Sequence, residues 1–253
     1  MAETINGSIE QTRNAKRGQE QTLRIAGINH FDPTMRSELI QWLNSCSKRF
    51  GTPKFIAVEW DNEVFDGVRA ERQQFRRLLA EAWQWISKSH LDTLTISLGY
   101  EADAHSDIYP DVEVLWLDQG RVYPKDFVAK CAKNRLKQYE GFLQNWPTST
   151  DNSNLLLRIR QRASNVPPPQ ADARDKKWTE LIKARLCDPR DSWAIAIVCS
   201  DHARAGCGSM RHLDEQMGFH CEVCLLTEPL KLGTSIPPSR GSRAGRVLGN
   251  KSS

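Results

Sequence analysis

Long apolar runs are missing from this chain of 253 residues. No stretch approaches the ~18 apolar residues that a membrane span requires, and residues 1–20 lack the apolar segment of a signal peptide. We therefore expect a cytoplasmic protein that is neither secreted nor embedded in a membrane. A Gly-x-Ser-x-Gly motif is also missing, which argues against a serine hydrolase with a nucleophile elbow.

Regularly spaced cysteines are missing as well. The seven cysteines are irregularly placed, and Cys221-x-x-Cys224 is the one close pair. A structural zinc site usually needs a second pair, and the nearest extra ligands are Cys207, His212 and His220. The pattern leaves two interpretations open, a zinc knuckle or two reduced thiols in a buried strand.

An excess of positive charge is missing from the body of the chain. The net charge is +4, from 35 Lys and Arg against 31 Asp and Glu. The region from residue 231 onward contains no acid and five bases, which are Lys231, Arg240, Arg243, Arg246 and Lys251. Without them 30 bases face 31 acids, so we expect no strong nucleic-acid binding, only weak salt-sensitive contact through the tail.

The composition, 39% hydrophobic and 26% charged, is typical of a soluble globular protein. Residues 1–20 are polar and predict a flexible arm, and residues 21–228 predict a single domain. Within it, 147–172 contains TSTDNSN and VPPPQ, which predict a mobile insert or linker. The basic residues 229–253 predict a disordered tail.

Apolar segments alternate with amphipathic segments along the domain. The predicted strands are 22–28, 55–59, 94–98, 112–117, 193–199 and 219–226. The predicted helices are 33–50, 65–87, 126–146, 174–186 and 208–217, with a short one beginning near residue 99. Strict alternation predicts the α/β class, with a largely parallel sheet and flanking helices.

Two segments of the chain resemble each other. IAGINH leads into a helix, a glycine and FIAVEW, and IVCSDH leads into a helix, a glycine and CEVCLL. In each, a histidine follows an apolar strand directly. Because ligands of open α/β sheets bind outside the carboxyl ends of the strands, His30 and His202 are expected to face one central cleft formed by two related halves.

Three carboxylates share that predicted placement. Glu59 and Asp118 end predicted strands, and Glu101 follows another. Two imidazoles with two or three carboxylates suit a divalent transition metal, and they equally suit acid–base chemistry without a metal. The residues leave both readings open.

This ordered series of motifs resembles the TraB/TIKI superfamily, whose clan includes erythromycin esterase-like and ChaN-like proteins. The resemblance extends over about residues 22–227 and rests on Gly27, His30, Glu59, Gly99, Glu101, Asp118, Arg121, Arg174, Asp175 and His202. Three features depart from the family pattern. Cys199 stands where glycine is usual, Trp178 stands where methionine is usual, and Gln119 separates Asp118 from the nearby Arg121.

The resemblance implies a compact α/β domain and a hydrolase that acts on a peptide, ester or lactone bond of a peptide or small-molecule substrate. It also implies dependence on a divalent metal ion (Mn, Co, Zn or Fe). The alternative is a non-catalytic regulatory protein of the same fold that binds a metal, haem or peptide. The sequence leaves the oligomeric state open.

The expected roles follow from the same resemblance. His30, His202 and Glu59 are the expected metal ligands, or the groups that flank the reacting centre if no metal is used. Glu59 and Glu101 are the expected general bases. Arg174 is expected to stabilise negative charge on the substrate, with Asp175 orienting it or a histidine. Gly27, Asp118 and Arg121 are additional candidates.

Overall fold

The computed structural model describes residues 9–10, 21–30, 32–143, 155–156, 159, 174–187, 193–204, 210, 214–215 and 218–226. Structural statements below concern these residues. The predicted disordered tail lies outside them from residue 229 onward, as does most of the predicted arm and insert.

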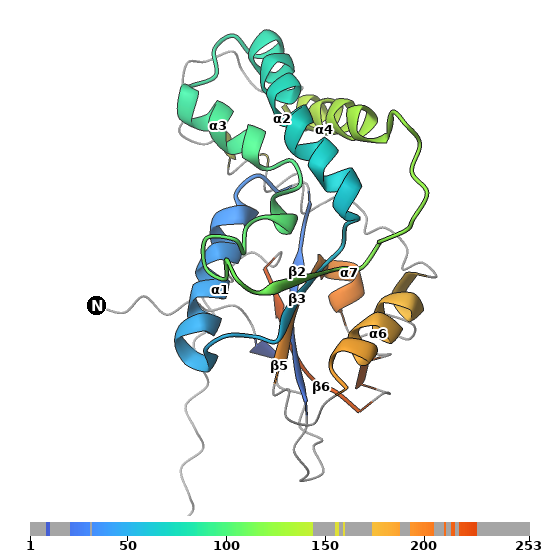
Figure 1. The fold of residues 1–253 in the computed structure, drawn as a ribbon. Helices are drawn as coiled ribbons and strands as arrows, with labels where there is room; N and C mark the ends of the chain where they lie inside the picture. Colours follow the sequence, from blue (N-terminus) through green and yellow to red (C-terminus); the bar gives the residue numbers. More distant parts are fainter. Residues whose placement is uncertain are drawn as a thin grey trace, which may run out of the picture.

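A six-stranded sheet forms the centre of the molecule, in the order β1-β6-β2-β5-β3-β4 (Figure 1). The strands are β1 (Ile9–Glu10), β2 (Thr22–Ile28), β3 (Phe55–Val58), β4 (Glu113–Trp116), β5 (Trp193–Cys199) and β6 (His220–Leu225). The five strands β2 to β6 are parallel, and the short β1 pairs antiparallel with β6. The predicted α/β class with a largely parallel sheet is confirmed.

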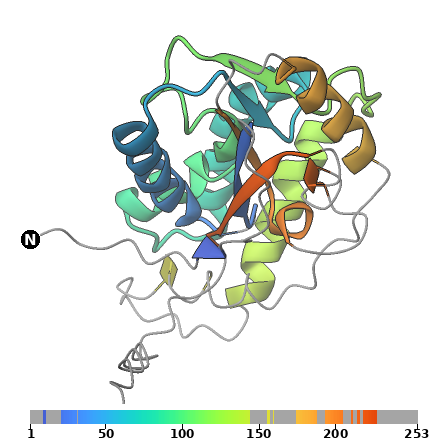
Figure 2. The same cartoon turned by 90° about the horizontal axis from the view of Figure 1, so that it is seen from below.

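Helices cover both faces of the sheet (Figures 1 and 2). They are α1 (Met35–Phe50), α2 (Asn62–Ala82), α3 (Lys88–Ile96), the 3₁₀ helix η1 (Tyr100–Ala102), α4 (Phe127–Leu143), α6 (Arg174–Arg185) and α7 (Ser200–Ala203). One core cluster joins α1 and η1 to one face, and another joins α6 and α7 to the opposite face. Alternate side chains of each strand therefore enter different cores.

The two central strands are almost wholly buried. All seven residues of β5 are buried, as are six of the seven residues of β2. Burying a side chain such as Ile or Leu stabilises the fold by about 1.5–3 kcal/mol, so these apolar runs fix the middle of the sheet. Their register pairs Ile28 with Cys199, so both strands end at the same level.

The strand order interleaves the two similar segments of the sequence. The unit β2-α1-β3 leaves room for β5 between its strands, and β2 lies between β5 and β6. The first strand of each unit is thus at the centre, next to the other. Interleaving places the residues that follow β2 beside those that follow β5, although they are about 170 positions apart in the sequence.

A third core cluster lies among α2, α3 and α4, which pack together beyond one end of the sheet (Figure 1). Phe75, Leu79 and Tyr139 are fully buried there. Leu155 and Ile159, from the predicted mobile insert, are also fully buried in this cluster. These two residues are packed, which the prediction of a mobile segment did not anticipate.

The strand predicted at 94–98 is wrong, because this segment belongs to α3 and the turn after it. Ser87 caps the helix by accepting a hydrogen bond from the backbone N–H of His90. The hydroxyl of Thr95 donates to the carbonyl of Leu91, which satisfies a β-branched residue inside a helix. Leu94 and Leu98 then face the helical core cluster rather than a sheet.

Two terminal predictions also need correction. The helix expected to begin at residue 33 begins at Met35, with Thr34 as its N-cap. The Asp32 carboxylate accepts a hydrogen bond from the backbone N–H of Thr34 at 2.9 Å in the turn before the helix. Within the arm predicted to be flexible, Ile9–Glu10 forms the edge strand β1. Its pairing with β6 protects that edge of the sheet.

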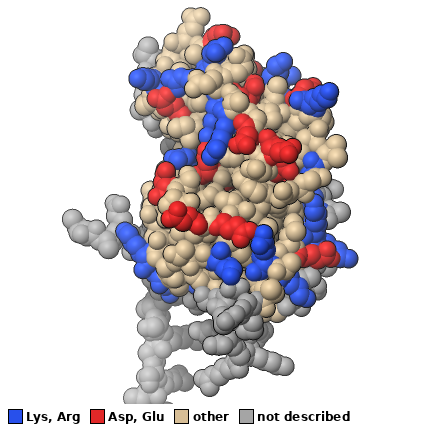
Figure 3. All heavy atoms as spheres, in the orientation of Figure 1, with Lys and Arg blue, Asp and Glu red and all other residues tan. Residues whose placement is uncertain are grey.

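Charges of both signs are interspersed on the face shown in Figure 3, over the described residues. Several of them form ion pairs, such as Arg72 with Asp103 at 2.7 Å. None of the helices in the described part of the chain has the length and apolar character needed to span a bilayer.

Candidate functional site

Four polar side chains gather where the parallel strands β2, β3, β4 and β5 end. Glu59 follows β3 directly, and His30 and Asp118 each come two residues after a strand. His202 lies on α7, which begins immediately after β5. Glu101 was also expected to follow a strand, but it lies on η1 after α3. It reaches the same edge of the sheet through the helical layer.

Gly27 allows α7 to approach β2. A Cβ atom at Gly27 would lie 2.6 Å from Leu225 Cδ2, 2.9 Å from Ala203 Cβ and 3.2 Å from Ser200 Cα. These separations are too short for any side chain. Gly27 therefore acts by close packing, and it permits the position of the helix that carries His202.

The Glu59 carboxylate lies at the centre of the site. Its Oε2 accepts a hydrogen bond from the Cys199 backbone N–H at 2.8 Å and lies 3.6 Å from His30 Nε2. Its Oε1 lies 3.3 Å from a terminal nitrogen of Arg174 and 3.7 Å from His202 Nε2. Both imidazole separations exceed a direct hydrogen bond but lie within the range of an ion pair.

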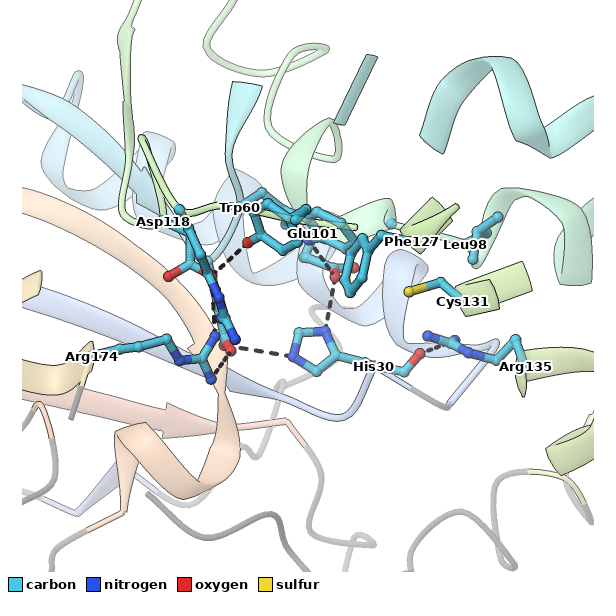
Figure 4. A pocket seen from close by; sticks show the side chains of 13 residues that line it. His30, Trp60, Leu98, Glu101, Asp118, Phe127, Cys131, Arg135 and Arg174 are labelled. Carbon is cyan, nitrogen blue, oxygen red and sulfur yellow. Dashed lines mark hydrogen bonds and ion pairs between the residues drawn. The ribbon is translucent and has the colours of Figure 1, made fainter. Parts of the chain in front are cut away.

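His30 is held from its other nitrogen. Its Nδ1 lies 2.8 Å from Glu101 Oε1, which also accepts a hydrogen bond from the Trp60 indole at 2.7 Å (Figure 4). Glu101 is 1% exposed, so solvent competes little for it. Arg135 donates to the backbone carbonyl of His30. These contacts fix the imidazole so that Nε2 faces Glu59.

His202 is held in the same way. Its Nδ1 lies 2.5 Å from Asp175 Oδ1, and both side chains are 2% exposed. The Trp178 ring packs against the imidazole with a centroid separation of 4.8 Å. A buried carboxylate on one ring nitrogen therefore directs the other nitrogen of each histidine toward Glu59.

Arg174 joins Glu59 to Asp118. One terminal nitrogen lies 3.3 Å from Glu59, and the other donates to Asp118 Oδ2 at 3.1 Å (Figure 4). Asp118 accepts further hydrogen bonds from Trp178 at 3.0 Å, Tyr123 at 2.9 Å and Arg121 at 3.2 Å. Asp118 is thus an anchor for Arg174, and its oxygens are already occupied by donors.

The pKa of Glu59 reflects these surroundings. Burial alone would raise it. The contact with His30 acts in the opposite direction, as do the charges of His202 and Arg174, and together they lower the pKa of Glu59 to about 2. Glu59 is therefore a carboxylate at neutral pH.

Both histidines have the opposite shift. Burial alone would lower the pKa of His30, but the Glu101 charge and polar contacts raise it well above its ordinary value. Burial would likewise lower the pKa of His202, and the contact with Asp175 and the charge of Glu59 raise it. Burial alone would raise the pKa of Glu101, but the His30 charge outweighs burial and the pKa of Glu101 is lowered. Both shifts favour the imidazolium form of a histidine beside its carboxylate.

A cavity of about 230 Å³ opens beside these residues. Arg174 and Asp118 line one end, and His30 and Glu101 line its middle (Figure 4). Leu98, Phe127, Cys131 and Arg135 lie at the other end, supplied by α4 and the segment after α3. The cavity therefore lies between the carboxyl edge of the sheet and the helical layer.

No group of three or more His, Cys, Asp and Glu side chains among the described residues has the arrangement of a metal site. Glu59 already meets Arg174 and the Cys199 backbone, and the guanidinium supplies the positive charge that a metal would bring. The divalent metal ion predicted to be bound by His30, His202 and Glu59 stays a prediction.

The structure brings together the charged residues of the motif series. His30 and His202 both face Glu59, and Glu101 supports His30. The remaining contacts are Asp175 with His202, Arg174 with Glu59 and Asp118, and Arg121 with Asp118.

Other lining and supporting residues were missed. Trp60 follows Glu59 in the sequence, and Trp178 stands where methionine is usual in the family pattern. A tryptophan within an apolar segment is ordinarily interpreted as part of the core. Tyr123, Cys131 and Arg135 carry no motif signal, because they reach the site only through the path of the chain and the packing of α4.

The fold and site together define an α/β protein with a parallel sheet and a polar site at the carboxyl edge. No protein-family model matches the chain, and neither does any curated protein or solved structure.

Proposed function

We propose that this protein is a hydrolase that cleaves an ester, lactone or peptide bond by acid–base chemistry. One observation carries the proposal. The Nε2 atoms of His30 and His202 lie 3.6 and 3.7 Å from the two oxygens of Glu59, so two imidazoles converge on one carboxylate, and both Glu59 and His30 line the cavity. The resemblance of the motif series to the TraB/TIKI superfamily supports the same class of reaction.

In the first step, a water held by Glu59 attacks the substrate carbonyl carbon. A bond forms between the water oxygen and that carbon, and the carbonyl electron pair moves onto the carbonyl oxygen. The water proton passes to Glu59. Arg174 stabilises the developing oxyanion, because its guanidinium lies 3.3 Å from Glu59 and lines the same cavity. His202, whose Nε2 lies 3.7 Å from Glu59, holds that carboxylate in place.

A carboxylate with a pKa of about 2 is a weak base in the resting site. Arg174, one of the cations that lower the pKa of Glu59, also interacts with the oxyanion as negative charge develops there. Its attraction to Glu59 weakens at that moment, so the basicity of Glu59 rises when the proton must move. Stabilisation of the oxyanion and activation of the water are therefore coupled.

In the second step, the tetrahedral intermediate collapses. The carbonyl reforms and the bond to the leaving oxygen or nitrogen breaks, while His30 Nε2 donates its proton to the leaving atom. Glu59 returns the proton to His30, which leaves an acid and an alcohol or amine. Glu101 acts through His30, so it is a positioning residue in this scheme rather than a second general base.

The test is hydrolysis of chromogenic esters, lactones and short peptides by the wild type and by Glu59→Gln. Glutamine keeps an acceptor for the Cys199 backbone but cannot take a proton. We expect kcat to fall by about 10²–10⁴-fold. Glu63→Gln is the matched control, because Glu63 is an exposed residue in the first turn of α2. Circular dichroism checks that each variant folds.

Equal rates for wild type and Glu59→Gln would overturn this mechanism. No turnover by the wild type on any of these classes would overturn the hydrolase proposal itself. Tight binding of a metal, haem or peptide without turnover would then support the regulatory alternative.

A further inference from the structure

The cavity beside the site has two chemically different ends. Toward Arg174 and Asp118 its wall is charged, and Arg174 contacts Glu59, the proposed base, at 3.3 Å (Figure 4). Beyond His30 the wall is formed by Leu98, Phe127 and Cys131. None of these three takes part in the proposed reaction, so the apolar end is left for recognition.

The helical layer builds this apolar end. Phe127 and Cys131 lie one turn apart on α4, so their side chains face the same side of that helix. Leu98 is 2% exposed and belongs to the core cluster that holds α2, α3 and α4 together. The wall is therefore anchored in a packed core and is preformed for a ligand.

The volume limits what this end holds. A cavity of about 230 Å³ is smaller than the pockets of roughly 300–1,000 Å³ that enclose whole drug-sized ligands. At the volume that a water occupies in the liquid, it holds roughly eight non-hydrogen atoms. A carboxyl group and the attacking water take roughly four of these, which leaves room for a chain of roughly four further carbons.

Charge limits it further. Arg135 lines the apolar end and is 8% exposed, and it donates to the His30 carbonyl. A buried guanidinium repels a second cation at close range in a medium of low dielectric constant. An acyl group that ends in an ammonium is therefore disfavoured, and an uncharged chain is accommodated.

We propose that Leu98, Phe127 and Cys131 form an acyl-binding pocket, and that the substrate is an ester with a short, uncharged, apolar acyl group of about four to six carbons. This inference rests on the proposed hydrolase function. It adds the substrate class and the residues that select it.

The experiment measures kcat/KM for p-nitrophenyl esters with acetyl, butyryl, hexanoyl, octanoyl and 6-aminohexanoyl groups. Each buried methylene is expected to raise kcat/KM about fourfold up to the butyryl or hexanoyl ester. The octanoyl ester is expected to show no further gain. The 6-aminohexanoyl ester is expected to be at least tenfold poorer than the hexanoyl ester.

Variants assign the effect to the pocket. Cys131→Phe adds a ring to the apolar end and is expected to lower the hexanoyl-to-acetyl ratio at least tenfold. Phe127→Ala enlarges this end and is expected to move the optimum to octanoyl. Cys187→Phe is the matched control, because Cys187 is exposed after the end of α6. If Cys131→Phe does not fold, Cys131→Met serves as the smaller change.

A separate readout distinguishes failure of the pocket from failure of the hydrolase function. Calorimetry measures hexanoate binding to the wild type and to the folded Cys131 variant. Ester hydrolysis with no dependence on chain length, or with no effect of the Cys131 variant, overturns the acyl pocket and leaves the hydrolase proposal standing. No hydrolysis, with hexanoate binding that the variant loses, overturns the hydrolase and retains the pocket. Neither hydrolysis nor binding overturns both.

Discussion

Asp214 is a buried carboxyl group near Asp175, the residue that contacts His202. Replacement of Asp214 by asparagine is expected to stabilise the protein. The side chain is 0% exposed. Burial raises the pKa of Asp214 from 3.8 to about 8, and the charges of Asp175 and Glu215 add to that effect while Thr179 opposes it. The carboxyl is thus mostly protonated in the folded protein at neutral pH.

The sign of the pH dependence follows from proton uptake. Between about pH 4 and pH 8 the folded state holds a proton on Asp214 that the unfolded state has released. The free energy of unfolding therefore falls as pH rises through this window, by up to about 1.4 kcal/mol per pH unit. Asparagine has no such proton, so the advantage of Asp214→Asn over the wild type grows by roughly 3–4 kcal/mol between pH 5 and pH 8.

Urea unfolding followed by tryptophan fluorescence measures this difference at pH 5, 6, 7 and 8. Asp111→Asn is the control, because Asp111 is exposed and its replacement is expected to change stability little at any pH. A difference between Asp214→Asn and wild type that stays constant with pH, or shrinks as pH rises, would refute the reasoning. It would mean that the buried carboxyl is as acidic in the folded chain as in the unfolded one.

Three further changes test the site. Glu101→Gln removes the anion that raises the pKa of His30. The loss of kcat/KM at high pH should therefore begin at a lower pH than in the wild type. A shift of this loss to higher pH would contradict the role of His30 as the acid. Gly27→Ala inserts a methyl group where α7 meets β2. We expect it to lower the free energy of unfolding by about 1–3 kcal/mol and to lower kcat by displacing His202. A melting curve like that of the wild type would show that the backbone accommodates the methyl group without cost. Metal content after chelation and reloading, in the wild type beside His30→Ala and His202→Ala, tests the metal prediction. Stoichiometric metal lost in both variants would support it, and no specific metal in the wild type would remove it.

The strands and helices most readily predicted are those with one dominant pattern. The limits of β2 and β5 match the prediction, since each is a short, mainly apolar segment of the kind that forms a buried parallel strand. The prediction for residues 94–98 was wrong because two patterns fit this segment equally well. Its alternating residues fit a strand, but Leu91, Leu94 and Leu98 also fit a helical stripe. Packing against α2 and α4 selected the helix.

The site shows the same division. The rule that ligands meet the carboxyl edge of a parallel sheet was enough to group His30, Glu59, Asp118 and His202. It gave the wrong reason for Glu101, which reaches the edge from the helical layer. The pairing of each histidine with its own buried carboxylate, Glu101 for His30 and Asp175 for His202, was not readable from sequence spacing.

The sequence by itself determined the α/β class, the central strands and the chemical types available at their ends, because apolar periodicity and strand-end position are local properties of the chain. Only the tertiary structure decided which groups face one another. Interleaved strands bring His30 and His202 to opposite oxygens of Glu59, and α4 supplies Phe127, Cys131 and Arg135 to the cavity. Such contacts depend on strand order and on the packing of helices distant in sequence, and no local pattern encodes either.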